Sequence, residues 1–183
     1  MKSEGPERLG ERTLYVGRVF RLLRRSIRLA SGKRQDIDVV QHPGAVAIAA
    51  RDARGRMLLV RQFRAALEID TLEVPAGRVE AGESPLACAK RELEEETGMR
   101  ADHWRPLRTL YPAPGFCSEV IRLFEARDLH EIPGGGAACD DDEELETVWK
   151  DPAEILAMDP VDSKTFVCAW LMAGDPAGRE RDP

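Results

Sequence analysis

Apolar residues occur in short runs and in partly alternating segments along most of the chain, a pattern that predicts strands more often than helices. The stretch Gly44–Ala50 is apolar throughout, which is typical of a buried strand. Asp52–Arg56 contains a glycine and predicts a hairpin loop after that strand. Residues 1–12 are polar and are expected to be irregular. Further strands are expected at 14–20, 26–29, 35–40, 57–63, 71–74, 107–111, 120–126 and 145–150.

Helix signals occur at three places, two of them near the C-terminus. A short helix is expected at Asp151-Pro152, and Asp162 can cap a final helix over residues 163–173. The third helix begins after Ser84, a suitable N-cap residue, and ends at Gly98. Many strands with few helices imply an α+β domain.

Within the third helix, four residues share one stripe at roughly 100° per residue. These residues are Leu86, Ala89, Leu93 and Thr97. We expect the helix to bury Leu86 and Leu93, and to hold carboxylates at the edge of the buried face.

Length and charge limit the classes of protein to consider. A chain of 183 residues fits one domain, here divided into a strand segment (1–40), a main domain (41–174) and a polar tail (175–183). The net charge of −6 disfavours a general nucleic-acid-binding role. No apolar run approaches the length of a membrane span, and the N-terminus has no secretory pattern. Four cysteines without a CxxC pair indicate reduced thiols and a cytoplasmic protein.

Carboxylates are crowded on the helix that follows Ser84. Glu92, Glu94, Glu95 and Glu96 are nearly contiguous, and like charges at neighbouring helical positions repel. A divalent cation would remove that penalty, because hard cations such as Mg²⁺ prefer oxygen ligands. An acidic run alone is more often a solvated helix face, so the spacing of the surrounding residues has to decide.

That spacing resembles the signature of the Nudix hydrolase family: Gly, five residues, Glu, seven residues, then Arg-Glu-aliphatic-x-Glu-Glu-x-Gly-aliphatic. No fixed position is missing here. The matching residues, called the Nudix box below, are Gly77, Glu83, Arg91, Glu92, Leu93, Glu95, Glu96, Gly98 and Met99. The resemblance implies a mixed β-sheet sandwiched between α-helices.

The resemblance also implies the chemistry, which is metal-dependent hydrolysis of a pyrophosphate bond. It assigns Glu92 and Glu96 as the principal Mg²⁺ ligands, with Glu95 sharing the cluster and the carbonyl of Ala76 as a further ligand; Mn²⁺ or Zn²⁺ are alternatives. Metal ions can neutralise the charge of the pyrophosphate and activate a water molecule. Glu83 and Arg91 are expected to tie the loop to the helix.

Segments outside the box resemble the ADP-ribose pyrophosphatase branch of the family, over roughly residues 40 to 171. These segments are Arg61–Arg64, Leu72–Gly77, Tyr111–Glu119 and Asp162–Thr165. The resemblance implies hydrolysis of ADP-ribose to AMP and ribose 5-phosphate. It places Arg64, Glu73, Pro114 and Gly115 in substrate binding. Taken alone, Pro-Gly is a turn, and a lone arginine is as often a surface residue.

Two assignments stay open at this point. The acidic run Asp140–Glu144 is expected to supply a catalytic carboxylate; Glu143 is favoured, with Glu144 and Asp141 as rivals. In this branch the N-terminal strands cross to a partner subunit, which implies a homodimer in which Phe20 stacks on the adenine. An aromatic residue in a strand is, however, more often part of a core.

Two other functions are compatible with the sequence. One is a Nudix pyrophosphatase for another nucleoside diphosphate sugar, such as GDP-mannose, or for a dinucleotide polyphosphate. The other is a non-catalytic Nudix module that senses a nucleotide. Retention of Glu92, Glu95 and Glu96 argues against the non-catalytic module.

Overall fold

The computed structural model of the chain describes residues 5–133 and 146–174. These residues form two compact units. The first unit contains residues 5–44 and 111–120, and the second contains residues 45–110 together with the described residues from 121 onward. The predicted division at residues 40 and 174 stays a prediction. None of the helices described is both long and apolar enough to span a bilayer.

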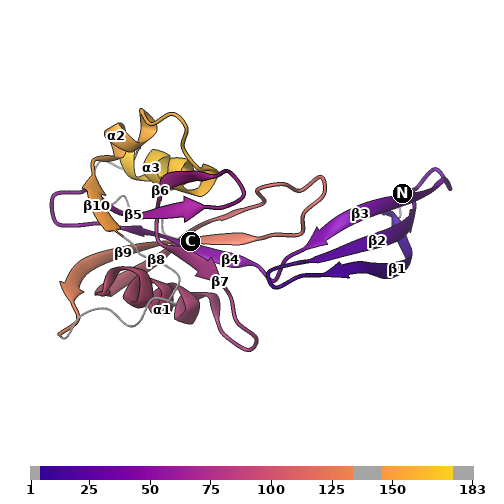
Figure 1. The fold of residues 1–183 in the computed structure, drawn as a ribbon, viewed down its shortest axis with the longest axis horizontal. Coiled ribbons are helices and arrows are strands. Elements are labelled where there is room, and N and C mark those ends of the chain that lie inside the picture. The colour runs from indigo at the N-terminus through magenta and orange to yellow at the C-terminus, as the bar shows by residue number, and fades with distance from the viewer. Residues whose placement is uncertain (1–4, 134–145, 175–183) are drawn as a thin grey trace. The chain divides into compact units, whose positions relative to one another are not determined.

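The first unit is built on an antiparallel sheet of β1 (Glu7–Val16), β2 (Arg21–Arg28) and β3 (Arg34–Gln41) in that order (Figure 1). Leu23 and Val39 are its only buried apolar side chains among the residues described. Ion pairs between charged side chains also join neighbouring strands of this sheet. The unit therefore has little core of its own.

The polar start of the chain is not irregular beyond residue 6, so that expectation was wrong. Glu7 is paired with Arg28 in the sheet register, and its carboxylate lies 2.7 Å from the arginine Nη1. Strand pairing and charge pairs order a segment that has no apolar pattern. The strand expected over residues 14–20 ends at Val16, where the turn to β2 begins.

The second unit holds two sheets. The larger is mixed, in the order β7 (Ala76–Arg78), β4 (Ala45–Ala50), β9 (Ile121–Glu131) and β8 (Met99–Leu110), with β4 parallel to β9. The smaller is antiparallel. It consists of β10 (Glu146–Lys150), β5 (Met57–Arg64) and β6 (Ile69–Glu73).

The loop expected at Asp52–Arg56 does reverse the chain, but the strands on either side enter different sheets. Only an isolated bridge between Arg51 and Met57 joins them. The connection is still a tight turn, since the Asp52 carboxylate accepts hydrogen bonds from the backbone N–H groups of Arg54 and Arg56, both at 2.9 Å.

Helices cover both sides of the strands in this unit (Figure 1). The helix α1 (Pro85–Thr97) packs on one face, and α2 (Pro152–Leu156) and α3 (Ser163–Ala173) lie on the other. Alternate residues of β4 point into two separate cores, so all six of its side chains are buried. This placement explains the continuous apolar run, and it confirms the predicted α+β class with a mixed sheet between helices.

The ends of α1 lie where the sequence predicts. The Ser84 hydroxyl accepts from the Ala87 N–H at 3.2 Å, and Gly98 has a φ of 67°, which favours glycine. The predicted stripe is wrong at one position, because Leu86 is 38% exposed. Cys88 is buried instead, next to Ala89 and Leu93.

Candidate active site

The loop before α1 begins with a close approach between Gly77 and Glu92. A Cβ atom added to Gly77 would lie 1.9 Å from the carboxylate carbon of Glu92, far inside van der Waals contact. The backbone of Gly77 lies in β7, and pairing with β4 fixes the position of this strand. Glycine is required here because the carboxylate packs directly against the main chain.

One guanidinium contacts three carboxylates of the Nudix box. Arg91 donates to both oxygens of Glu83 at 3.0 Å, to Oε1 of Glu92 at 2.9 Å, and to Oε2 of Glu95 at 2.8 Å. The hydrogen bond from Arg91 lowers the pKa of Glu83 to about 2. The structure thus brings together the pair expected to tie the loop to the helix.

Glu92 has an unfavourable environment for its charge. Burial raises its pKa above the ordinary value; Arg91 opposes that effect, and the charges of Glu95 and Glu83 add to it. One turn further along, Oε2 of Glu96 accepts from the Ala76 N–H at 3.1 Å. The four predicted metal ligands therefore lie on β7 and on one side of α1.

These residues fit a divalent cation by their chemistry. All the proposed donors are oxygens, which Mg²⁺ prefers. The partly buried carboxylate of Glu92 is not fully compensated by Arg91, so added positive charge would stabilise it. Among the residues described, however, no three acidic, histidine or cysteine side chains are already gathered around one point. An ion held here would draw on Glu92 and Glu95, each of which accepts a hydrogen bond from Arg91.

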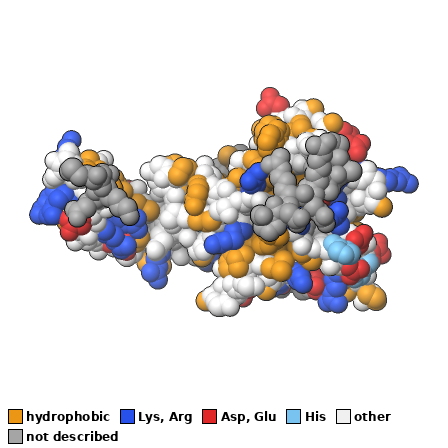
Figure 2. Space-filling model, turned by 180° about the vertical axis from the view of Figure 1, so that it is seen from behind, with side chains coloured by type: hydrophobic (Ala, Val, Ile, Leu, Met, Phe, Trp, Pro, Cys, Tyr) orange, Lys and Arg blue, Asp and Glu red, His pale blue; other side chains and the backbone are white. Residues whose placement is uncertain are grey.

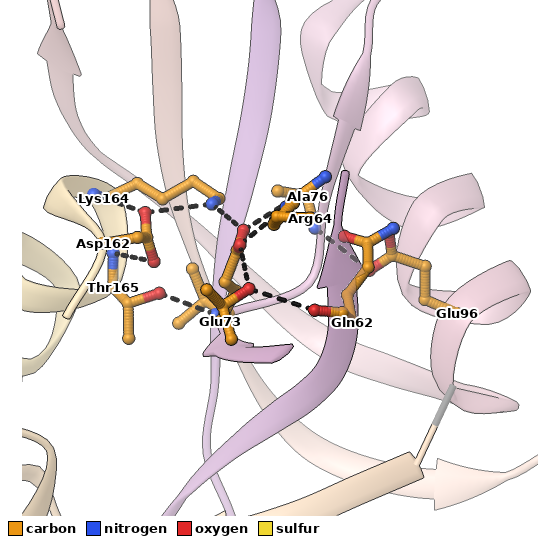
Figure 3. Close-up of polar contacts among 10 residues, drawn as sticks. Gln62, Arg64, Glu73, Ala76, Glu96, Asp162, Lys164 and Thr165 are labelled. Atoms are coloured by element: carbon orange, nitrogen blue, oxygen red, sulfur yellow. Dashed lines mark hydrogen bonds and ion pairs between the residues drawn. The ribbon is translucent and has the colours of Figure 1, made fainter. Parts of the chain in front are cut away.

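A second polar cluster, centred on Glu73, lies just before the box (Figure 3). The Glu73 side chain is only 4% exposed. Arg64 donates to Oε1 from Nε at 2.7 Å and to Oε2 from Nη2 at 2.6 Å, and Thr71 donates to Oε1 at 2.7 Å. Lys164 donates to Oε2. Burial would raise the pKa of Glu73, but Arg64 and Lys164 outweigh it and lower the pKa to about 2.

The first turn of α3 completes this cluster (Figure 3). Asp162 caps the helix by accepting from the Lys164 N–H at 3.0 Å, and it also contacts the Lys164 ammonium at 3.0 Å. The Thr165 hydroxyl accepts from the buried Val74 N–H at 2.8 Å. The strand that leads into the box is therefore fastened to α3 at two successive residues.

The sequence marks the segment Asp162–Thr165 as part of the resemblance but assigns no role to Lys164 or Thr165. The only available signal was a lysine and a hydroxyl residue directly after a helix cap. Their partners Glu73 and Val74 are 91 residues earlier in the chain, so spacing could not reveal the contacts.

The structure places the predicted substrate residues in two groups. Arg64 and Glu73 form the ion pair described above. Hydrogen bonding to Glu73 is the largest influence that raises the pKa of Arg64, and the charges of Glu96 and Asp162 contribute in the same direction. The guanidinium therefore lies within the electrostatic influence of the box.

The remaining predicted residues lie elsewhere in the chain. Phe20, Pro114 and Gly115 belong to the first unit. Pro114 and Gly115 lie in a turn closed by the hydrogen bond from the Cys117 N–H to the Ala113 carbonyl, at 2.8 Å. Their roles stay predictions. The rival loop carboxylates, Asp141, Glu143 and Glu144, lie outside the described residues.

Comparison with known proteins identifies a family and several named relatives. The model of the NUDIX domain family matches residues 40–169. The ADP-ribose pyrophosphatase of Bacillus subtilis is 34% identical over 168 residues, which is 90% of this chain and 91% of that protein. The ADP-ribose pyrophosphatase of Mycobacterium tuberculosis is 38% identical over 81% of this chain and 72% of that protein.

Two further comparisons bear on the fold and on the substrate. A crystal structure described as an ADP compounds hydrolase superposes with a TM-score of 0.80, covering 94% of this chain and 95% of that chain. Its sequence identity is 23%, so the likeness concerns the fold. Relatives named GDP-mannose pyrophosphatase are more distant; the one from Citrobacter koseri is 30% identical over 68% of this chain and 72% of that protein.

Proposed function

The chain belongs to the Nudix family, and from that premise we propose that it hydrolyses the pyrophosphate bond of ADP-ribose to give AMP and ribose 5-phosphate. The observation that carries the proposal is the match to ADP-ribose pyrophosphatases at 34% and 38% identity over most of the chain. The intact box supports catalysis over nucleotide sensing alone. GDP-mannose is the second candidate substrate, supported by more distant relatives.

The proposal assigns a divalent cation, Mg²⁺ first, to the carboxylates of Glu92, Glu95 and Glu96 and to the carbonyl of Ala76. When bound, the cation would neutralise phosphate charge and lower the pKa of a coordinated water. Glu83 and Arg91 hold the loop on the helix, and Gly77 lets the Glu92 carboxylate lie against the main chain. Arg64 supplies a guanidinium for a phosphate or ribose of the substrate.

The experiment that tests this function is a substrate panel with Mg²⁺. It measures nucleoside monophosphate release from ADP-ribose, GDP-mannose, NADH, diadenosine polyphosphates and dNTPs, with Glu96→Gln as the catalytic control. We expect clear preference for ADP-ribose and loss of turnover in the control. Preference for GDP-mannose would replace the substrate assignment, and a flat panel without metal-dependent turnover would reject the enzymatic proposal.

We propose further that the first unit forms a homodimer and contributes Phe20 to the adenine site. The sheet has few buried side chains, and apolar residues at the turn between β1 and β2 are exposed. These are Leu14, Tyr15, Val16, Val19 and Phe20, which range from 38% to 61% exposed. Figure 2 shows apolar and basic side chains exposed together over this unit. A small sheet of this kind is stabilised when a partner covers its apolar side chains.

Removal of residues 1–40 tests the dimer and the shared site together. We expect the shortened protein to be a monomer by light scattering and to have a higher KM for ADP-ribose. Phe20→Ala in the full chain separates the two effects, because it should raise KM while the protein stays dimeric. A shortened protein that is still a dimer by light scattering and has an unchanged KM for ADP-ribose would reject both roles.

A further inference from the structure

We infer that Lys164 is a positioning residue that fixes the orientation of the Arg64 guanidinium, acting through Glu73. The inference rests on the proposed function, in which Arg64 contacts the substrate. It gives a role to the segment Asp162–Thr165, whose sequence by itself shows only a similarity to the ADP-ribose pyrophosphatase branch.

The first step concerns the orientation of the Glu73 carboxylate (Figure 3). Each of its oxygens accepts one hydrogen bond from Arg64 and one from another side chain: Thr71 on Oε1 and Lys164 on Oε2. A two-point pair between guanidinium and carboxylate makes the two groups share a plane. The donors from Thr71 and Lys164 therefore set the plane of the carboxylate, and the carboxylate sets the plane of Arg64.

The second step concerns how Lys164 is held. Its side chain is 12% exposed, and its ammonium contacts Asp162, the capping residue of α3. Thr165, the next residue, accepts from the Val74 N–H, so the first turn of α3 is fixed to the residue that follows Glu73. Lys164 thus projects from a helix that is already fastened to the strand it acts on, as accurate positioning requires.

The third step concerns what remains of Arg64 for a ligand. Glu73 engages Nε and Nη2, so the Nη1 amino group lies outside this pair. The side chain is 40% exposed, and the charge of Glu96 acts on it. A phosphate held beside the box carboxylates can therefore meet Arg64 donors whose direction is determined by Glu73.

A purely structural role predicts a different behaviour. If Lys164 only offset the buried charge of Glu73, its loss would lower the melting temperature without a specific effect on substrate affinity. If Lys164 acts through Arg64, its loss should matter only when Arg64 is present. A double-mutant cycle distinguishes these cases.

The cycle uses Lys164→Met, Arg64→Gln and the double variant, with steady-state kinetics on ADP-ribose and thermal melting of each protein. We expect Lys164→Met to raise KM roughly tenfold, as loss of an orienting partner does, with kcat nearly unchanged. Arg64→Gln should raise KM at least as much, and adding Lys164→Met to it should raise KM no further. Lys164→Arg should restore most of the affinity, and Lys150→Met, on β10, serves as the matched control.

Two results would overturn the inference. The first is a KM of the double variant that rises by the product of the two single-variant factors, which would mean that Lys164 and Arg64 act independently. The second is a lower melting temperature of Lys164→Met with an unchanged KM. If Lys164→Met does not fold, Lys164→Gln takes its place in the same cycle. Failure of the proposed function is recognised separately, because the unmodified protein would then not hydrolyse ADP-ribose at all.

Discussion

Two groups of carboxylates lie on either side of Ala76, and they differ in how their charge is compensated. Glu73 is buried among two cations and a hydroxyl, and its pKa is lowered to about 2. Glu92 is partly buried beside one guanidinium and two further carboxylates, and its pKa is raised. The first arrangement is complete as the chain folds, whereas the second would be stabilised by more positive charge. The comparison separates a carboxylate whose charge is already compensated within the fold from one suited to hold a cation.

The largest test of this comparison is Glu92→Gln. We expect kcat to fall roughly 1000-fold, because metal-based charge stabilisation contributes several kcal/mol to such reactions. Stability in EDTA should not fall, because the folded protein disfavours the Glu92 charge at pH values above about 4.5. Steady-state kinetics with Mg²⁺ measure the change in kcat, and denaturant unfolding in EDTA measures the change in stability. Melting with added Mg²⁺ reports binding of the cation.

The matched control is Glu94→Gln, which removes a neighbouring carboxylate paired with Arg100 at 2.9 Å. It should retain activity, and Mg²⁺ should raise its melting temperature as in the unmodified protein. If Mg²⁺ raised the melting temperature of Glu92→Gln equally, Glu92 would not be a ligand.

An intermediate effect is expected for Gly77→Ala. The added methyl group would lie 1.9 Å from the Glu92 carboxylate, which must then move. A displacement of about 1 Å at a reacting group can lower turnover by roughly 100-fold. Steady-state kinetics measure it. Gly10→Ala is the control, because a methyl group there meets no atom within 4 Å. Equal activity in both variants would show that the close approach is not needed.

The smallest effect is expected for Glu73→Gln, on stability. The pKa of Glu73 is lowered in the folded protein, so its stabilisation is present above about pH 4.5 and is lost as pH falls toward 2. We expect the variant to be about 2 kcal/mol less stable at pH 7 and equal to the unmodified protein near pH 2. Urea unfolding across this range measures the difference. The exposed Glu146→Gln should show little change, and a gap that persists at pH 2 would contradict the assigned charge effect.

Local signals in the sequence predicted the parts of the fold that depend on neighbouring residues. Ser84 and Gly98 mark the ends of α1, and Asp162 marks the start of α3, because caps act within one turn. The apolar run of β4 also predicted its burial. The spacing of the box residues predicted the contact between Glu83 and Arg91. It did not predict that Arg91 also contacts Glu92, or that Gly77 lies against Glu92.

Contacts between distant segments could not be predicted in the same way. The sequence does not show that β4 and β5 enter different sheets, since both are short apolar strands separated by a turn. It does not show that Leu86 is exposed, because burial depends on what packs against the helix. Lys164 was missed for the same reason, since its partner Glu73 lies on another element.

The fastening of β6 to α3 has a consequence for synthesis of the protein. Val74 and its hydrogen-bond partner Thr165 are 91 residues apart. At typical translation rates Val74 therefore leaves the ribosome about 5–20 s before Thr165, whose hydroxyl accepts from the Val74 N–H. Until then, the Glu73 carboxylate lacks its lysine and the Val74 N–H lacks its hydroxyl acceptor. The segment that leads into the Nudix box is therefore completed by α3, the last element of the described residues, and a ribosome that stalls before α3 leaves Glu73 and Val74 without these partners.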